Sequence, residues 1–249
     1  MTLHPLAERF AAVAGAYERG RPEYPPAVTD LLAGELRLAP GARVLDLAAG
    51  TGKLSRALLA AGLEVVAVEP HAALREVLAE HVGAERVLDG RAEQIPLEDG
   101  TVAAVTIADA FHWFDQLAAL AEIRRVLIPG GGLAVIASVP NWRGASWAHE
   151  LGMLMFARRP EHPHFDGPPW GEAVVAAGGW SAPRELRVSV SQPASPSQIV
   201  DYVASMSWIA AMAESERTEL LGQVRGIVEA GETPAELPVE VVVGLSGLL

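Results

Sequence analysis

The clearest indication of the fold is the segment Arg43-Val-Leu-Asp-Leu-Ala-Ala-Gly-Thr-Gly52, followed by Lys53-Leu-Ser-Arg-Ala-Leu-Leu59. Its first half is a short apolar run of strand length, and its second half repeats apolar residues at helical spacing. Gly50 and Gly52 lie between the two and allow the backbone to turn sharply and to approach a ligand closely. The stretch therefore predicts a buried strand, a glycine turn and a helix whose free N–H groups point into the same crevice.

Asp46 interrupts the apolar run, and this acid narrows the choice of ligand. A carboxylate at the end of a buried strand is costly unless a partner offsets its charge. A nucleoside triphosphate loop needs glycine and Ser or Thr where this chain has Leu47 and Leu54. A dinucleotide fingerprint needs a third glycine where this chain has Ser55. Asp46 would face a pyrophosphate badly but suits an ammonium or a sulfonium; a structural turn without a ligand is the alternative.

The same residues carry a resemblance to a known family. Val44-Leu-Asp-Leu-Ala-Ala-Gly-Thr-Gly52 resembles motif I of the class I S-adenosylmethionine-dependent methyltransferases. The resemblance implies a Rossmann-like fold and S-adenosyl-L-methionine as the cofactor. It further implies that Asp46 and the backbone of Gly50 and Gly52 hold the amino-acid end of the cofactor, with Ala48 also among the binding residues.

A second acid follows the next predicted strand. Leu63-Glu-Val-Val-Ala-Val-Glu-Pro70 is rich in β-branched residues and ends in Glu69, 17 residues after Gly52. In nucleotide-binding α/β folds an acid about 20 residues past the glycine turn accepts hydrogen bonds from ribose hydroxyls. Pro70 then stops the strand. We expect Glu69 and Pro70 to contact the nucleoside; an ordinary solvated acid is the alternative for Glu69.

The loop Gly90-Arg-Ala-Glu-Gln-Ile-Pro96 resembles the segment that lies beside the adenine ring in the same family. The resemblance assigns Ala92 and Glu93 to cofactor binding. Many relatives have an acid one place earlier that bonds the adenine amino group, and this chain has Arg91 there. Backbone groups of Ala92 are the expected replacement for that contact.

Three aromatic residues and a histidine follow the predicted strand 101–108, in Asp109-Ala-Phe-His-Trp-Phe-Asp115. This segment resembles the family's segment between cofactor and acceptor. It implies that Asp109 and Phe111 bind the cofactor, with Phe111 and Trp113 as walls of a pocket. His112 is a candidate general base because imidazole titrates near neutral pH. A packed histidine bonded to the backbone is the alternative for His112.

The N-terminal region predicts a flap over the ligand crevice, spanning residues 1–29. A helix over 5–18 is followed by Arg19-Gly-Arg-Pro-Glu-Tyr-Pro-Pro26, whose prolines prevent a continuous helix. The pattern resembles a subgroup that includes trans-aconitate methyltransferase-like proteins. In such relatives the segment covers the cofactor, which implies that Tyr17 and Arg21 touch its methionine end. A plain surface linker is the alternative.

Strand and helix patterns alternate five times along the chain, which predicts an α/β fold with a doubly wound, Rossmann-like sheet. We expect a single domain over residues 1–249, with a seven-stranded, mostly parallel sheet, helices on both faces and a helical cap. The insertions 139–182 and 194–230 are expected to form that cap and to select the acceptor. The strands expected after the first are 63–70, 85–89, 101–108, 133–138, 185–190 and 237–243. The helices expected besides 5–18 and the one after Gly52 are 27–38, 71–82, 115–127, 197–212 and 214–229.

Composition excludes several other classes of function. The 249 residues carry a formal charge of −12, which argues against a general nucleic-acid binder. Cysteine is absent, so neither disulfides nor thiolate chemistry is available. No apolar run reaches the ~20 residues of a membrane span, and no signal peptide is recognisable, so we expect a cytoplasmic protein. His162 and His164 lie on a proline-rich loop that does not build a metal site alone, and we expect no metal.

The expected reaction is methyl transfer from S-adenosyl-L-methionine to a small-molecule acceptor, in keeping with small-molecule biosynthesis. Direct displacement needs little from side chains beyond alignment of the two reactants. Two alternatives stay open, because a fold does not fix its function. One is a protein that binds the cofactor but catalyses another step, such as a cyclisation. The other is a non-catalytic binding subunit.

Overall fold

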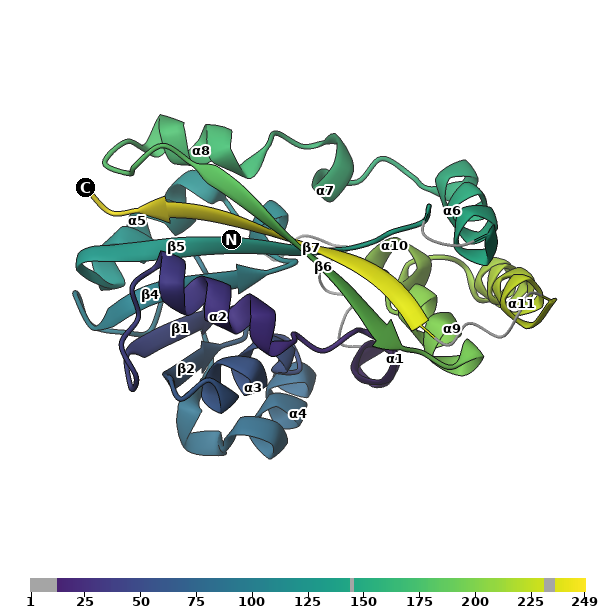
Figure 1. Ribbon diagram of the computed structural model, residues 1–249, viewed down its shortest axis with the longest axis horizontal. Helices are drawn as coiled ribbons and strands as arrows, with labels where there is room; N and C mark the ends of the chain where they lie inside the picture. The colour runs from purple at the N-terminus through teal and green to yellow at the C-terminus, as the bar shows by residue number, and fades with distance from the viewer. Residues whose placement is uncertain (1–12, 144–145, 231–235) are drawn as a thin grey trace. The chain divides into compact units, whose positions relative to one another are not determined.

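A computed structural model of the chain describes residues 13–143, 146–230 and 236–249 (Figure 1). Seven strands form one sheet in the order β3-β2-β1-β4-β5-β7-β6. The strands are β1 Arg43–Leu47, β2 Glu64–Val68, β3 Val87–Leu88, β4 Val102–Ala108, β5 Leu127–Pro140, β6 Arg184–Pro193 and β7 Glu236–Gly247.

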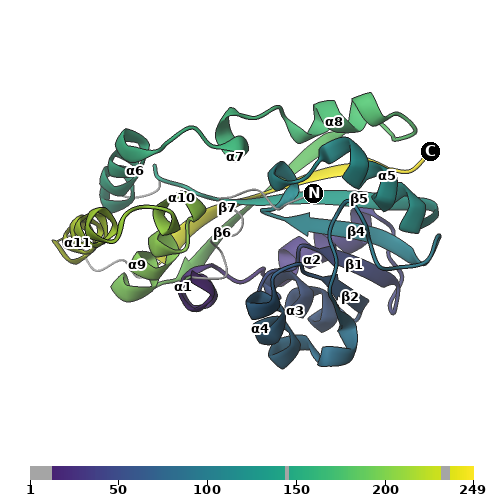
Figure 2. The ribbon, with the colours of Figure 1, turned by 180° about the vertical axis from the view of Figure 1, so that it is seen from behind.

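Helices cover both faces of the sheet. In Figure 1 α2 lies in front of the strands, and in Figure 2, which shows the opposite side, α5 lies in front. The helices are α1 Ala14–Gly20, α2 Pro26–Glu35, α3 Lys53–Ala60, α4 Ala72–Val82, α5 Gln116–Val126, α6 Ser146–Arg158, α7 Pro163–Asp166, α8 Trp170–Ala177, α9 Pro196–Ala204, α10 Ser207–Ala210 and α11 Glu214–Ala230. Short 3-10 turns include η2 Ala84–Arg86 and η3 Phe111–Trp113.

Strand directions show a mixed sheet. β1 runs parallel to β2 and β4, and β4 runs parallel to β5. β7 runs antiparallel to β5, since Leu248 N–H donates to Gly131 O near one end and Asn141 N–H donates to Pro238 O near the other. The order and the directions confirm the predicted Rossmann-like, mostly parallel sheet.

The strand of the opening stretch divides its side chains between the two faces. Leu45 and Leu47 belong to a buried cluster that includes Leu120 of α5, all at most 1% exposed. Asp46 points to the opposite face, where Ser55 of α3 donates to its carboxylate. This alternation is that of a strand buried on both faces, and it brings a carboxylate to the end of β1 beneath α3.

One strand begins earlier than predicted. β5 starts at Leu127, so the predicted start of this strand at residue 133 was wrong, and the strand also includes Pro129–Gly132. These residues continue beside β4 with an irregular register. A Cβ at Gly131 would lie 2.9 Å from the Ala103 carbonyl oxygen, so glycine permits this close approach of the two strands.

Other boundaries also shift. The third strand is only Val87–Leu88, because the 3-10 turn η2 precedes it. The single helix predicted over 197–212 is divided into α9 and α10, where Ser205 Oγ donates to Tyr202 O and competes with helix continuation. The proline-rich loop expected around His162 and His164 contains the short α7. Of the helix predicted over 5–18, residues 5–12 lie outside the described residues.

The chain forms two compact units. The sheet unit comprises Glu23–Ser138, Gly167–Val188 and Val241–Leu249. The helical unit comprises Met1–Pro22, Val139–Asp166 and Ser189–Glu240. Residues 167–182 belong to the sheet unit, where α8 packs against α5. The roles predicted for 1–29 as a flap and for 139–182 and 194–230 as an acceptor-selecting cap stay predictions.

Within the helical unit, an ion pair and a close backbone contact join α1 to α9. Arg19 donates from Nε and Nη2 to the Asp201 carboxylate at 2.7 and 3.0 Å. Gly20 packs directly on the α9 backbone, since a Cβ at this position would overlap the Tyr202 backbone nitrogen. The absence of a side chain at Gly20 therefore lets the two helices meet.

We predict that Gly20→Ala destabilises the protein by about 1–3 kcal/mol, the usual cost of forcing extra atoms into a packed contact. The matched control is Gly222→Ala on α11, where a Cβ meets no atom within 4 Å. That change should stabilise the protein by about 0.5–1 kcal/mol, because alanine favours a helix. Urea denaturation of both variants measures the difference, and equal midpoints would show that Gly20 is not a packing constraint.

Candidate functional site

The glycine turn connects β1 to α3 through three left-handed residues. Ala48, Gly50 and Gly52 have φ angles of 59, 59 and 90°. A Cβ at Gly50 would meet no atom within 4 Å, whereas one at Gly52 would lie 2.6 Å from Leu78 Cδ1 of α4. Gly52 is thus required for packing, while the side of the turn at Gly50 has room for another molecule. Ala48 adopts a conformation that L-residues rarely accept, which marks strain at this position.

Glu69 joins the ends of β2 and β1. One carboxylate oxygen accepts the Gly50 N–H at 2.9 Å, and the other accepts the His71 N–H at 2.9 Å. The residue is 3% exposed. Burial raises the pKa of Glu69 to about 7, although the two N–H donors lower it. Glu69, the acid predicted to bind the ribose, thus also holds the predicted glycine turn in place through the Gly50 N–H. His71 precedes α4 and makes no side-chain cap.

Asp46 is buried, at 1% exposed, between β1, β4 and α3. Its Oδ2 accepts the Ser55 hydroxyl at 2.5 Å, and its Oδ1 lies 3.5 Å from Thr106 Oγ1. Burial raises the pKa of Asp46 to about 6, and the hydroxyl donors lower it. The acid therefore ties β1 to α3 and β4, and a direct contact with a cofactor remains a prediction.

The residues expected around the nucleoside lie in two loops of the sheet unit. Arg75 donates to the Pro70 carbonyl at 2.7 Å, which fixes the chain after β2. Ala92 is buried in the core, at 4% exposed. Glu93 accepts the Asp115 N–H at 3.0 Å and lies 3.7 Å from Arg91. Glu93 thereby links the loop after β3 to the segment after η3.

Asp109 directly follows β4 with a φ angle of 52° and is a second strained residue at this edge of the sheet. Its carboxylate accepts the Ser138 N–H at 2.9 Å, and Ser138 Oγ donates to the Tyr24 hydroxyl at 3.2 Å. The ends of β4 and β5 are thus linked to the segment that follows Pro22. No sequence motif assigned a site role to Tyr24 or Ser138.

The aromatic segment forms the 3-10 turn η3. Phe111 is 3% exposed and packs in the buried cluster that also includes residues of α5, and its role as a pocket wall stays a prediction. Trp113 is partly buried against the same cluster, and its ring centroid lies 4.4 Å from that of His112. His112 is partly exposed, and its role as a base stays a prediction.

Tyr17 and Arg21 belong to the helical unit. The Arg21 guanidinium lies 5.2 Å from the Tyr17 ring centroid and 4.9 Å from that of Tyr202. Its Nε donates to Ser205 Oγ at 3.0 Å. Arg21 is therefore ordered between two aromatic rings, and the predicted contact of Tyr17 and Arg21 with the cofactor is a proposal.

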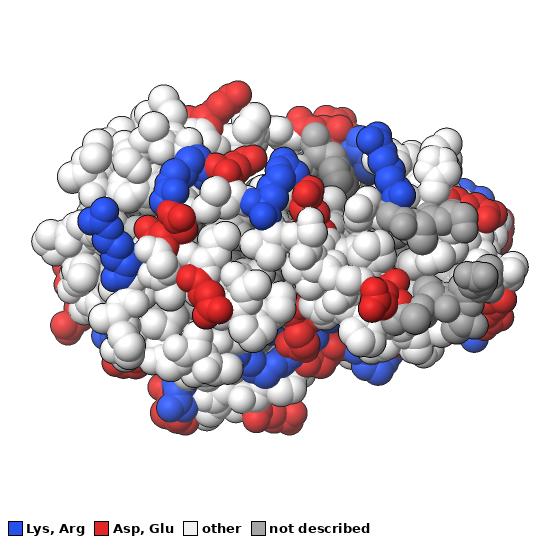
Figure 3. Space-filling model, viewed as in Figure 1, with Lys and Arg blue, Asp and Glu red and all other residues white. Residues whose placement is uncertain are grey.

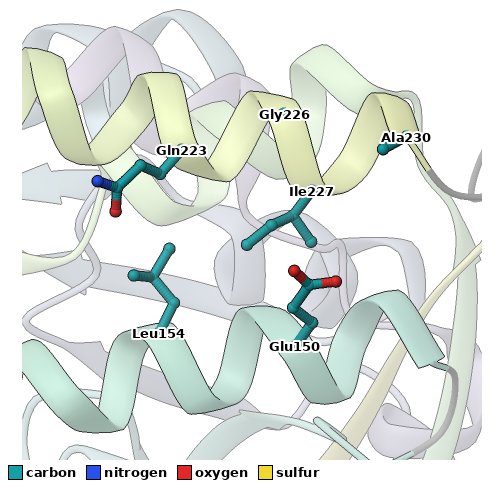
Figure 4. Close-up of a pocket in the computed structure, with 6 residues that line it drawn as sticks. All are labelled: Glu150, Leu154, Gln223, Gly226, Ile227 and Ala230. Atoms are coloured by element: carbon teal, nitrogen blue, oxygen red, sulfur yellow. The ribbon is translucent and has the colours of Figure 1, made fainter.

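The described residues also form a groove that none of the predicted site residues lines. A groove of about 450 Å³ lies between α6 and α11 of the helical unit (Figure 4). It is lined by Glu150, Leu154, Gln223, Gly226, Ile227 and Ala230.

On the face drawn in Figure 3, acidic and basic side chains are interspersed. Within the described residues, no helix meets the length and apolarity needed to cross a bilayer.

His162 is held inside the helical unit. Its Nδ1 accepts the His164 N–H at 3.2 Å, so Nε2 carries the proton that it shares with Ser207 Oγ at 2.9 Å. A histidine that donates to a serine cannot take that serine's proton. Among the residues that the structure describes, no three His, Asp or Glu side chains gather as metal ligands.

Comparison with known proteins identifies the family. Residues 45–135 match a family described as a methyltransferase domain. An uncharacterized methyltransferase of Mycobacterium tuberculosis is 37% identical over 219 residues, which cover 88% of this chain and 85% of that protein. The demethylmenaquinone methyltransferase of Thermus thermophilus is 44% identical over 110 residues, 41% of this chain and 50% of that enzyme.

A solved structure supports the same family assignment. A candidate type II methyltransferase from Anaeromyxobacter dehalogenans is 26% identical and superposes with a TM-score of 0.63, covering 92% of this chain and 97% of that one. The matched residues 45–135 contain the glycine turn and Glu69 described above. The chain therefore belongs to the class I S-adenosylmethionine-dependent methyltransferases.

Proposed function

We propose that the sheet unit binds S-adenosyl-L-methionine at the carboxyl ends of β1, β2 and β4 and directs its methyl group to a small-molecule acceptor. The contact between Glu69 and the Gly50 N–H carries this proposal. It brings the acid after β2 and the turn after β1 to one edge, where ligands bind in open α/β sheets. The open space beside Gly50 and the acidic character of this edge fit a cationic nucleoside.

Each group has a distinct task in this proposal. Glu69 accepts hydrogen bonds from the ribose hydroxyls, and the backbone of Gly50 and Gly52 lines the amino-acid end. The buried Asp46 acts through its negative charge and through α3, which it holds by Ser55. Ala48 shapes the turn by its left-handed backbone.

The remaining predicted residues complete the cofactor site by family resemblance. Pro70, Ala92 and Glu93 border the nucleoside, and Asp109 and Phe111 border the methyl group. Tyr17 and Arg21, on the proposed flap, approach the methionine end. The further assignment to the trans-aconitate methyltransferase-like subgroup rests on that N-terminal pattern alone.

The chemistry requires the protein mainly to align two reactants. The bound cofactor supplies a methyl group on a sulfonium, and this chain's residues bind it, orient it and exclude water. Alignment alone contributes on the order of 7–11 kcal/mol to such reactions. His112 is the candidate base for an acceptor that must lose a proton. The Thermus relative is named for a quinone substrate, which supports a small organic acceptor.

Product analysis tests the function. We predict that the protein, incubated with S-adenosyl-L-methionine and a panel of small phenols, quinols and carboxylic acids, yields both a methylated mass and S-adenosylhomocysteine. Mass spectrometry measures both products. Cofactor binding without either product would instead favour a non-methylating reaction such as a cyclisation, or a binding subunit.

The pH dependence of binding tests Glu69. We predict that affinity for S-adenosyl-L-methionine rises with pH through about 7, because the ionised carboxylate accepts ribose hydroxyls more strongly. Below the pKa the gain is at most about tenfold per pH unit. Titration calorimetry measures it, and Glu69→Gln should abolish the slope and weaken binding by roughly 1–3 kcal/mol. A wild-type affinity independent of pH would contradict the role.

The stability of the cofactor-free protein should change with pH in the opposite direction to its affinity for the cofactor. Because the folded pKa of Glu69 lies above its ordinary value of 4.5, its stabilising contribution is complete below about 4.5 and is lost as pH rises through about 7. Rising pH thus weakens the free protein while it strengthens cofactor binding, so the cofactor-induced shift in Tm should grow over this range.

A pair of variants separates the charge of Asp46 from its structural role. We predict that Asp46→Asn, which keeps an oxygen for Ser55, raises the Kd for the cofactor about tenfold, or ~1.4 kcal/mol, without lowering Tm. Ser55→Ala, the control, keeps the charge but loses the hydrogen bond. This variant should therefore lower Tm, with only a small effect on the Kd for the cofactor. Equal cofactor affinities in Asp46→Asn and wild type would show that the Asp46 charge does not contribute to cofactor binding.

A further inference from the structure

A three-residue ion cluster lies beside the glycine turn. A single oxygen of Glu23, Oε1, accepts from Lys53 Nζ at 2.7 Å and from Arg56 Nη2 at 2.8 Å. Arg56 also directs its Nη1 toward the Thr51 carbonyl at 3.4 Å, inside the turn itself. Burial raises the pKa of Glu23, but the hydrogen bonds and charges of Lys53 and Arg56 outweigh it and lower the pKa. All four residues belong to the sheet unit.

Lys53 occupies a position that ordinary helix energetics disfavour. It is the first residue of α3, and its side chain is only 7% exposed. The N-terminus of a helix carries a partial positive charge, so a cation there is repelled, and a buried cation needs a partner. The Glu23 carboxylate supplies that compensation from a segment 30 positions earlier in the chain.

The next residue of that segment is held at a second point. Tyr24 accepts the Ser138 hydroxyl at 3.2 Å, and the Ser138 N–H is bound by Asp109. Ser138 lies near the end of β5, and Lys53 begins the helix after β1. Glu23 and Tyr24 are thus tied to two places at the carboxyl edge of the sheet, so this short segment crosses the edge where the cofactor is proposed to bind.

We propose that Lys53 and Arg56 are positioning residues that clasp Glu23 and so hold residues 23–24 across the glycine turn, and that this clasp retains the bound cofactor. The inference rests on the proposed function and assigns these side chains no part in the chemical step.

The proposal predicts a defect in affinity that depends on salt. Glu23→Gln in the full chain should raise the Kd for S-adenosylhomocysteine about tenfold, with kcat changed far less than the KM for the cofactor. The Glu23 side chain is 55% exposed, so salt screens the clasp and should weaken wild-type binding. The Glu23→Gln variant should lose most of this salt dependence.

The matched control is Glu64→Gln, which removes the same charge from the sheet unit at the opposite edge. Glu64 begins β2 and pairs with Arg43 at 3.2 Å. This variant should bind the nucleoside as the wild type does. Lys53→Met, which keeps the apolar stem, and the double variant with Glu23→Gln complete a cycle whose effects should be non-additive.

The outcomes separate the clasp from the function beneath it. Wild-type protein that does not bind S-adenosylhomocysteine would overturn the proposed function. Wild-type binding, together with a Glu23→Gln affinity equal to that of Glu64→Gln, would overturn the clasp alone. Should Lys53→Met fail to fold, Glu23→Gln at the more exposed side of the pair still decides between these outcomes.

Discussion

The hydrogen bond from the Gly50 N–H to the Glu69 carboxylate is the interaction on which the rest of the site depends. It fixes the turn after β1 against the end of β2, and the rest of the edge is built around it. Asp46 lies close enough to raise the pKa of Glu69 further, so two buried acids share this edge in a protein of net charge −12. Such an arrangement costs folding free energy, and a positively charged ligand would offset it.

Two of the three non-glycine residues with left-handed φ angles in the described chain lie at the same edge, and the third, Arg37, precedes β1. Ala48 and Asp109 both have left-handed φ angles, and they follow β1 and β4, the two neighbouring strands at the centre of the sheet. Non-glycine residues persist in this conformation only where surrounding contacts hold them, and such residues gather at functional sites. The Ser138 N–H holds Asp109, and the packing of Gly52 against Leu78 anchors the turn that Ala48 opens. Strain, buried charge and the open space beside Gly50 therefore coincide.

Local patterns in the sequence predicted the centre of the fold well. The apolar run before Asp46 and the β-branched run before Glu69 each specify a strand by themselves, so the sequence alone places both acids at strand ends. Phe111 could not be assigned in this way, because an aromatic residue at the end of a strand has the same pattern whether it lines a pocket or fills the core. The pair between Glu23 and Lys53 was missed because nothing in either segment signals a partner 30 residues away. The start of β5 was misjudged because Pro-Gly-Gly-Gly usually ends an element.

A crystal structure of the protein grown with S-adenosylhomocysteine would show directly whether Glu69 and the glycine turn hold the cofactor. The account predicts the nucleoside at the carboxyl edge of the sheet, with its ribose hydroxyls within hydrogen-bond distance of the Glu69 carboxylate and its amino-acid end beside Gly50. A nucleoside bound away from Glu69, or bound there through other groups while Glu69 keeps only its backbone partners, would contradict the account.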